Sequence, residues 1–262
     1  MDKNATGRSG RSELMLLVVA ATTIFCVAPA SATPTTKIFE RILPLRAGGA
    51  LTLTNVNGYV RIVGWDREAV EIRAVKTALN DPQDIERVKI NVESSGERAA
   101  INTIYPQGNG VAVTVDYQIH VPDRILLDGI ETVNGDVRVA RVSGGGVLGS
   151  VNGSVEVVDS NGRFSAKTTN GDVRLELKSL PEGEPMQLAT VNGSVILSLP
   201  TGAGAELNVI SRNGDFHSDF PLSSLGAYNA SVFRGRLGSG GGEILLTTVN
   251  GAIRLVQGKP VI

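Results

Sequence analysis

The chain has 262 residues and a formal net charge of −1, with 25 basic and 26 acidic side chains. This balance argues against a nucleic-acid-binding protein, because such proteins normally carry an excess of basic residues. Glycine is abundant, with 31 residues, whereas aromatic residues make up only 4% of the chain. A chain rich in Val and Gly and poor in aromatic residues indicates many strands joined by tight turns.

The first 32 residues have the pattern of an export signal. A basic start precedes an apolar run at 14–27, and Ala30 and Ala32 then stand where signal peptidase requires small residues. We predict a signal peptide at 1–32, cleaved between Ala32 and Thr33, and an exported protein in the periplasm, at the cell surface or secreted. The apolar run is shorter than the ~20 residues of a membrane span, so we expect no transmembrane segment in the mature chain. Cys26 lies inside the signal, which leaves the mature chain without a thiol.

Residues 33–130 are predicted to form an N-terminal β region that caps the rest of the chain. Asp81 and Pro82 offer an N-cap and a first helical position, so one short helix is expected near 82–87. Trp65 is expected to plug one end of a strand. Alternating apolar and polar residues predict strands at 51–54, 60–63, 70–75, 89–93, 99–104 and 111–121.

Residues 131–258 repeat one short phrase, which reads apolar, Asn, Gly, polar, apolar. Most successive copies are 18 to 22 residues apart, and such a period is typical of stacked repeat arrays. The frame at 233–237 has Arg in the place of Asn, and residues 259–262 form a tail. The copies, including one far upstream, carry Asn57-Gly58, Asn134-Gly135, Asn152-Gly153, Asn170-Gly171, Asn192-Gly193, Asn213-Gly214 and Asn250-Gly251.

Two architectures compete for this pattern. Asn-Gly is a strong signal for a two-residue hairpin, which would give a meander or sandwich. In a hairpin, however, Val133 would pair with Asp136 on one face, which is a poor match. At a corner of a solenoid, the Val can turn inward and the polar residue outward. We therefore predict an all-β fold, a single-stranded β-solenoid or β-helix-like array with an N-terminal β-sheet cap.

The repeated phrase is interpreted as a structural turn motif. In a solenoid, the Asn side chains would stack as an amide ladder, as they do in cross-β stacks. The Gly beside each Asn would supply the positive φ of a tight corner. If the coils stack in register, one polar face would carry Asp136, Arg138, Glu156, Asp172, Arg174 and Glu176.

No catalytic, cofactor-binding or metal-ligating set is predicted. The chain has two histidines, His120 and His217, and neither has carboxylates at metal-ligand spacing. The aspartates that follow Asn-Gly lack the fixed nine-residue spacing of calcium-binding repeats. Parallel β-helices include polysaccharide-cleaving enzymes that use clustered carboxylates. A glycan-acting enzyme therefore stays open as an alternative.

Several phrases together resemble a known bacterial family. They are Phe39-Glu40-Arg41, Asn55 to Gly58, Gly64-Trp65-Asp66, and Tyr117 to Pro122 followed by Thr132 to Val137. With the exported start, they look like the DUF4097 family of proposed adhesin domains. The resemblance implies a β-solenoid-like fold and a location at the cell envelope or surface. It implies no catalytic residues.

These observations predict an exported, non-enzymatic binding or scaffolding module of the bacterial cell envelope. Its partner would be an unidentified envelope component, either a protein, peptidoglycan or another glycan, and not nucleic acid. Two alternatives remain, a β-helix enzyme that acts on glycans and a sensor of envelope stress.

Overall fold

The structure is a computed structural model that describes residues 34–108, 110–183, 185–225 and 231–258. All of them belong to one compact unit, Thr33–Ile262. The predicted signal peptide, its cleavage site and the tail at 259–262 lie outside the described residues. In the part of the chain that is described, no helix has the length and apolar character needed to cross a membrane.

Among the described residues, nearly all regular structure is β, and the one helix is α1, Asp84–Arg87, close to the expected position. The strands are β1 Thr35–Thr54, β2 Val60–Trp65, β3 Ala69–Ala78, β4 Lys89–Ser94, β5 Gly96–Ile104, β6 Val113–Pro122, β7 Leu126–Glu131, β8 Val137–Ala140, β9 Gly146–Gly149, β10 Val155–Asn161, β11 Phe164–Lys167, β12 Val173–Ser179, β13 Met186–Asn192, β14 Val195–Leu199, β15 Ala205–Asn213, β16 Phe216–Ser218, β17 Leu222–Ser224, β18 Val232–Leu237, β19 Glu243–Asn250 and β20 Ile253–Gln257.

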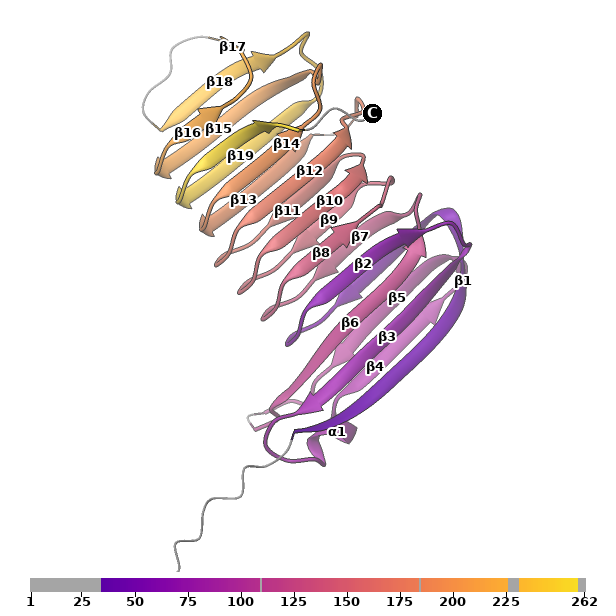
Figure 1. Cartoon of the computed structure of the whole chain (residues 1–262). Coiled ribbons are helices and arrows are strands. Elements are labelled where there is room, and N and C mark those ends of the chain that lie inside the picture. The colour runs from indigo at the N-terminus through magenta and orange to yellow at the C-terminus, as the bar shows by residue number, and fades with distance from the viewer. Residues whose placement is uncertain (1–33, 109, 184, 226–230, 259–262) are drawn as a thin grey trace, which may run out of the picture. The chain divides into compact units, whose positions relative to one another are not determined.

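The strands wind into a solenoid, as the sequence predicted. Each coil gives one strand to each of two facing layers, sheet A and sheet B, and neighbouring coils pair in parallel (Figure 1). Sheet A runs β1 (first half), β3, β6, β2, β8, β10, β12, β14, β20, β16. Sheet B runs β4, β5, β1 (second half), β7, β9, β11, β13, β19, β15, β18, β17.

Alternation along each strand builds the core. In β12, Val173, Leu175 and Leu177 are buried between the sheets, while Arg174 and Glu176 face outward. The same period of two recurs in the neighbouring coils, so aliphatic side chains stack on one another along the whole interior. This stacking explains why a chain with few aromatic residues can still bury a continuous core.

The N-terminal region continues the stack and closes it. The second half of β1 and β2 form a coil beside β7 and β8, and β5 and β6 form the coil before it. Beyond this coil the pairing is antiparallel. In sheet A, β3 pairs with β6 and with the first half of β1, and in sheet B, β4 pairs with β5. Helix α1 lies at the same end (Figure 1). Buried Lys76 donates from Nζ to the carbonyls of Ile85 (2.7 Å) and Val88 (3.0 Å), which ties α1 to β3.

The order of coils in space differs from the order along the chain. β19 and β20 insert between the coil of β13 and β14 and the coil of β15 and β16. The expectation that 233–237 is another corner is wrong. This segment lies in β18, which runs antiparallel to β15 and covers its outer edge together with β17. The chain therefore makes its end cap before it returns to complete the last inner coil.

Candidate functional site

The Asn residues of the repeated phrase meet at the same corner of each coil that carries the phrase. Each side chain after Asn57 donates from Nδ2 to Oδ1 of the Asn in the preceding coil of the stack, at 2.7 to 2.9 Å. Because β19 and β20 are inserted, Asn250 lies between Asn192 and Asn213. The ladder runs Asn57, Asn134, Asn152, Asn170, Asn192, Asn250, Asn213.

The glycines of the phrase are required mainly for space. A Cβ on Gly153 would lie against the carbonyl oxygen of Gly135 in the preceding coil. Positive φ does not explain the whole set, because Gly135, Gly153 and Gly214 do not have it. The expectation of a positive φ at each corner is therefore wrong for these three glycines. The feature common to all the glycines of the phrase is instead the close approach of the neighbouring backbone. The same carbonyl contact recurs at Gly58, Gly135, Gly171, Gly193, Gly214 and Gly251, where Gly58 meets Val115.

A second ladder, inside the corner, was missed by sequence reasoning. Two residues before each Asn stands a buried polar residue, Ser or Thr in all coils but one. Thr168, for example, donates from its hydroxyl to the Gly153 carbonyl at 2.7 Å. The signal was present in the sequence, one residue before the first position of the phrase. The members are Asn55, Thr132, Ser150, Thr168, Thr190, Ser211 and Thr248.

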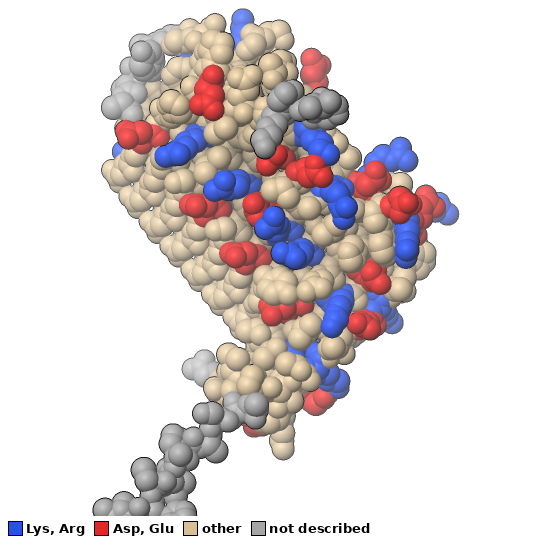
Figure 2. Space-filling view, viewed as in Figure 1, with Lys and Arg blue, Asp and Glu red and all other residues tan. Residues whose placement is uncertain are grey.

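The Val residues before Asn134, Asn152 and Asn192 turn outward, which contradicts the expected inward direction. Val133, Val151 and Val191 are 38%, 42% and 40% exposed. The reason is strand alternation, because the preceding Ser or Thr takes the inward position to satisfy the carbonyl groups there. Apart from Arg212, which stands before Asn213, the residues before the Asn ladder therefore present an uncharged edge to solvent. Figure 2 shows this edge at lower left, with charged side chains gathered on the face beside it.

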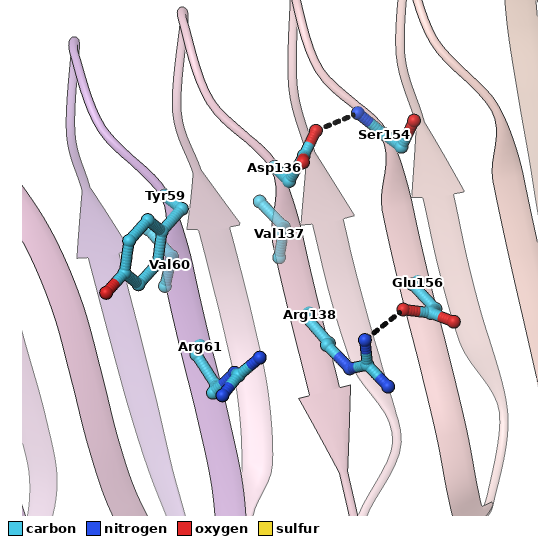
Figure 3. A pocket seen from close by; sticks show the side chains of 8 residues that line it. All are labelled: Tyr59, Val60, Arg61, Asp136, Val137, Arg138, Ser154 and Glu156. Carbon is cyan, nitrogen blue, oxygen red and sulfur yellow. Dashed lines mark hydrogen bonds and ion pairs between the residues drawn. The ribbon is translucent and has the colours of Figure 1, made fainter.

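The outward face of sheet A carries the polar residues that the sequence placed on one face. In the row next to the corner, the aspartates are engaged by the backbone. Asp136 accepts the N–H of Ser154 at 2.7 Å (Figure 3). Asp172 accepts the N–H of Ser194, also at 2.7 Å. On β6, in the coil beyond the first copy of the phrase, Asp116 accepts the N–H of Tyr59 at 3.1 Å, and burial raises the pKa of this carboxyl.

The next row holds arginines. The register aligns Arg61 with Arg138, Glu156 and Arg174, and then Ile196 and Arg254 across β2, β8, β10, β12, β14 and β20. Arg138 pairs with Glu156 at 3.0 Å. Within the described parts of the chain, no carboxylate lies at ion-pair distance from Arg61, Arg174 or Arg254. The Arg row, as we call these four arginines, is therefore only partly neutralised.

A groove of about 420 Å³ crosses the start of this row. Tyr59 and Arg61 stand on one side and Arg138 and Glu156 on the other, with their side chains directed out of the sheet (Figure 3). The groove has the volume of a small-molecule subsite. The full lining is Tyr59, Val60, Arg61, Asp136, Val137, Arg138, Ser154 and Glu156.

The histidines and the tryptophan have local partners. His120 contacts Glu71 at 3.0 Å and stacks on Trp65, whose indole donates to the Ala69 carbonyl. His217 lies 3.3 Å from an Asp219 oxygen. Among the residues that the structure describes, no group of three or more His, Cys, Asp or Glu side chains is placed to hold a metal ion.

Comparison with known proteins finds one matching family model, that of the Toastrack DUF4097 family, over residues 127–256. No curated protein matches the chain. Among solved structures, a proposed cell adhesion protein from Clostridium sporogenes is 13% identical, with a TM-score of 0.48, over 85% of this chain and 100% of its own. A proposed adhesin from Bacteroides fragilis is 11% identical, with a TM-score of 0.41, over 84% and 97%. A proposed lipid-binding protein from Parabacteroides distasonis is 8% identical, with a TM-score of 0.37, over 85% and 97%.

Proposed function

The chain belongs to the Toastrack DUF4097 family through residues 127–256, and on that basis we propose that it is an exported, non-enzymatic binding module of the bacterial cell envelope. The observation that carries the proposal is the outward face of sheet A. Its strands hold Arg61, Arg138, Arg174 and Arg254 in one row. A stack of coils joined by the Asn ladder keeps such a row straight and rigid, which lowers the entropy lost on binding.

The state of the carboxylates on this face favours binding over glycan cleavage. Glycosidases place two carboxyl groups on opposite sides of the scissile bond, one as acid and one as base or nucleophile. Here Asp136 and Asp172 accept backbone N–H groups, and Glu156 pairs with Arg138. These three carboxylates are thus occupied by structural contacts. Cleavage remains the competing activity that an experiment has to measure.

The proposal is tested by co-sedimentation of the purified protein with envelope fragments, in parallel with a reducing-sugar assay on the same material. We expect the protein to pellet with the fragments and to release no sugar. Treating the fragments beforehand with protease, or with glycan-degrading enzymes, identifies the class of component that is bound. Release of new reducing ends would support the enzyme instead, and absence of binding to any fraction would overturn the binding function.

Export and a sensing role are tested in the cell. Sequencing the N-terminus of the protein recovered from the periplasm or medium should show processing between Ala32 and Thr33. Retention of the intact protein in the cytoplasm would contradict export. If deletion of the gene changed an envelope-stress reporter while the purified protein bound no fraction, the sensor alternative would replace the binding module.

A further inference from the structure

We propose that the Arg row and the adjoining groove bind a linear acidic polysaccharide, with uronate carboxylates seated on the arginines. This inference rests on the proposed function and names the ligand class of the same face. The occupant is a flat, extended chain whose sugars lie along the stacking axis and cross the strands of sheet A.

The first argument is unneutralised charge. Arg61 and Arg138 stand side by side on β2 and β8, and one carboxylate, Glu156, pairs with Arg138. Aligned like charges on neighbouring strands destabilise a sheet unless a counter-charge arrives. Asp136 lies close by, but its Oδ1 already accepts the Ser154 N–H at 2.7 Å. Arg61 is therefore available for an anion from solution.

The second argument is periodicity. β10 lies between Arg138 on β8 and Arg174 on β12, and β14 lies between Arg174 and Arg254 on β20. Strands are spaced at about 4.8 Å, so these arginines recur at about 10 Å along a straight line. In a flat β-1,4-linked polymer, successive sugars face opposite sides, so carboxylates on one side recur at every second sugar. A compact anion would meet only one member of this row, whereas an extended uronate chain meets several.

The third argument is the lining of the groove. Tyr59 is 39% exposed and flanks Arg61, so a sugar held by Arg61 has an aromatic side chain next to it (Figure 3). The Tyr59 hydroxyl already accepts from Gln118 at 3.2 Å, which fixes the ring beside the groove. The guanidinium group can grip a carboxylate with two parallel N–H donors. The groove thus combines an apolar surface with charge, as sugar acids require.

The test compares poly-β-1,4-mannuronate with β-1,4-mannan, because the two polymers share a backbone and differ in the carboxylate. Binding is measured by titration calorimetry at low salt. We expect the purified chain to bind the uronate polymer and not the mannan. Affinity should increase with oligosaccharide length until the ligand spans the row from Arg61 to Arg254, since linked contacts reinforce one another.

A triple variant, Arg61→Gln with Arg174→Gln and Arg254→Gln, should weaken binding by tenfold or more, which corresponds to about 1.4 kcal/mol. A matched control removes the same charge elsewhere, with Gln replacing arginines that lie off this face. It carries Arg46→Gln, Arg98→Gln and Arg124→Gln, and it should bind like the unmodified protein.

Three results would overturn the inference. They are equal affinity for mannan, equal weakening by both triple variants, and affinity for polyphosphate or single-stranded DNA that matches the uronate. If the protein pellets with envelope fragments but ignores the uronate polymer, the ligand class is wrong and the binding function stands. If it binds neither, both proposals fail.

Discussion

The Asn ladder makes a prediction that depends on position. An inner member such as Asn152 makes two amide hydrogen bonds, to Asn134 at 2.9 Å and from Asn170 at 2.8 Å. The end member Asn213 makes one, to Asn250 at 2.9 Å. Asn152→Ala should therefore cost about twice as much stability as Asn213→Ala, even though the two residues have the same place in the phrase.

The magnitude follows from the number and exposure of these bonds. A hydrogen bond contributes about 0.5–1.5 kcal/mol net, and the lower half of that range applies to the exposed ladder. The loss should be about 1–2 kcal/mol for Asn152→Ala and about 0.5–1 kcal/mol for Asn213→Ala. None of the ladder Asn residues has a positive φ, so alanine adds no backbone strain that would confuse the comparison.

Urea unfolding followed by circular dichroism measures the difference in the free energy of unfolding. Asn91→Ala is the control, because this exposed amide contacts Glu93 outside the ladder and should change stability little. In the double variant, Asn152→Ala with Asn170→Ala, the shared bond is lost only once, so the cost should be less than the sum of the single costs. Equal costs at inner and end positions, or simple additivity of the neighbours, would refute the ladder as a chain of pairwise bonds.

Three further predictions concern the corner, the cap and pH. Gly153→Ala should destabilise the protein by about 2 kcal/mol or more in thermal unfolding, because the new methyl group meets the backbone of the preceding coil, whereas Gly149→Ala has room and should stay within about 0.5 kcal/mol. Lys76→Met should cost about 2 kcal/mol in urea unfolding, because it leaves two carbonyls at the end of α1 without their donor, and an unchanged midpoint would contradict that contact. Asp116 has a pKa raised by burial, so the folded state holds its proton more tightly and loses stability as pH rises from the unfolded pKa, ~3.9, through the folded one. Asp116→Asn keeps the acceptor for the Tyr59 N–H. Its gain over the unmodified protein should therefore grow across that pH window and level off above it; a gain that does not change with pH would contradict the raised pKa.

Sequence reasoning predicted the solenoid because the information for it is local. Alternation in 173–177 decides which side chains are buried, and the Asn-Gly period shows that equivalent corners recur. Which coils become neighbours is a different question. The phrase around Asn250 is like the other copies. It therefore predicts that this coil stacks on others, but it does not identify the two coils between which it lies. In the observed order, β18 pairs antiparallel with the outer edge of β15, a contact of which the phrases gave no sign.

The direction of the Val residues was predicted wrongly for a related reason. Hydrophobicity alone favoured burial of Val151, but the Gly135 carbonyl at the same corner needs a donor, and the hydroxyl of Ser150 supplies it at 2.8 Å. An unsatisfied buried carbonyl costs about 1–3 kcal/mol, which is comparable to burying one Val side chain. Because strand neighbours face opposite sides, placing the hydroxyl inside forces the Val outside.

The repeated corner stabilises the fold, whereas the variable outward face of sheet A is the proposed binding surface. From coil to coil, the phrase keeps the inner hydroxyl, the Asn and the Gly, since each is fixed by a contact with the next coil. The outward positions differ between coils, as at Arg138, Glu156 and Ile196, because no neighbouring backbone depends on them. Substitutions on the Arg row should therefore change what the protein binds while changing its free energy of unfolding by no more than about 0.5 kcal/mol, as is usual for surface sites. Substitutions in the corner should do the reverse. A corner variant that retained full stability but lost binding would place the binding surface on the ladder edge instead of the face of sheet A.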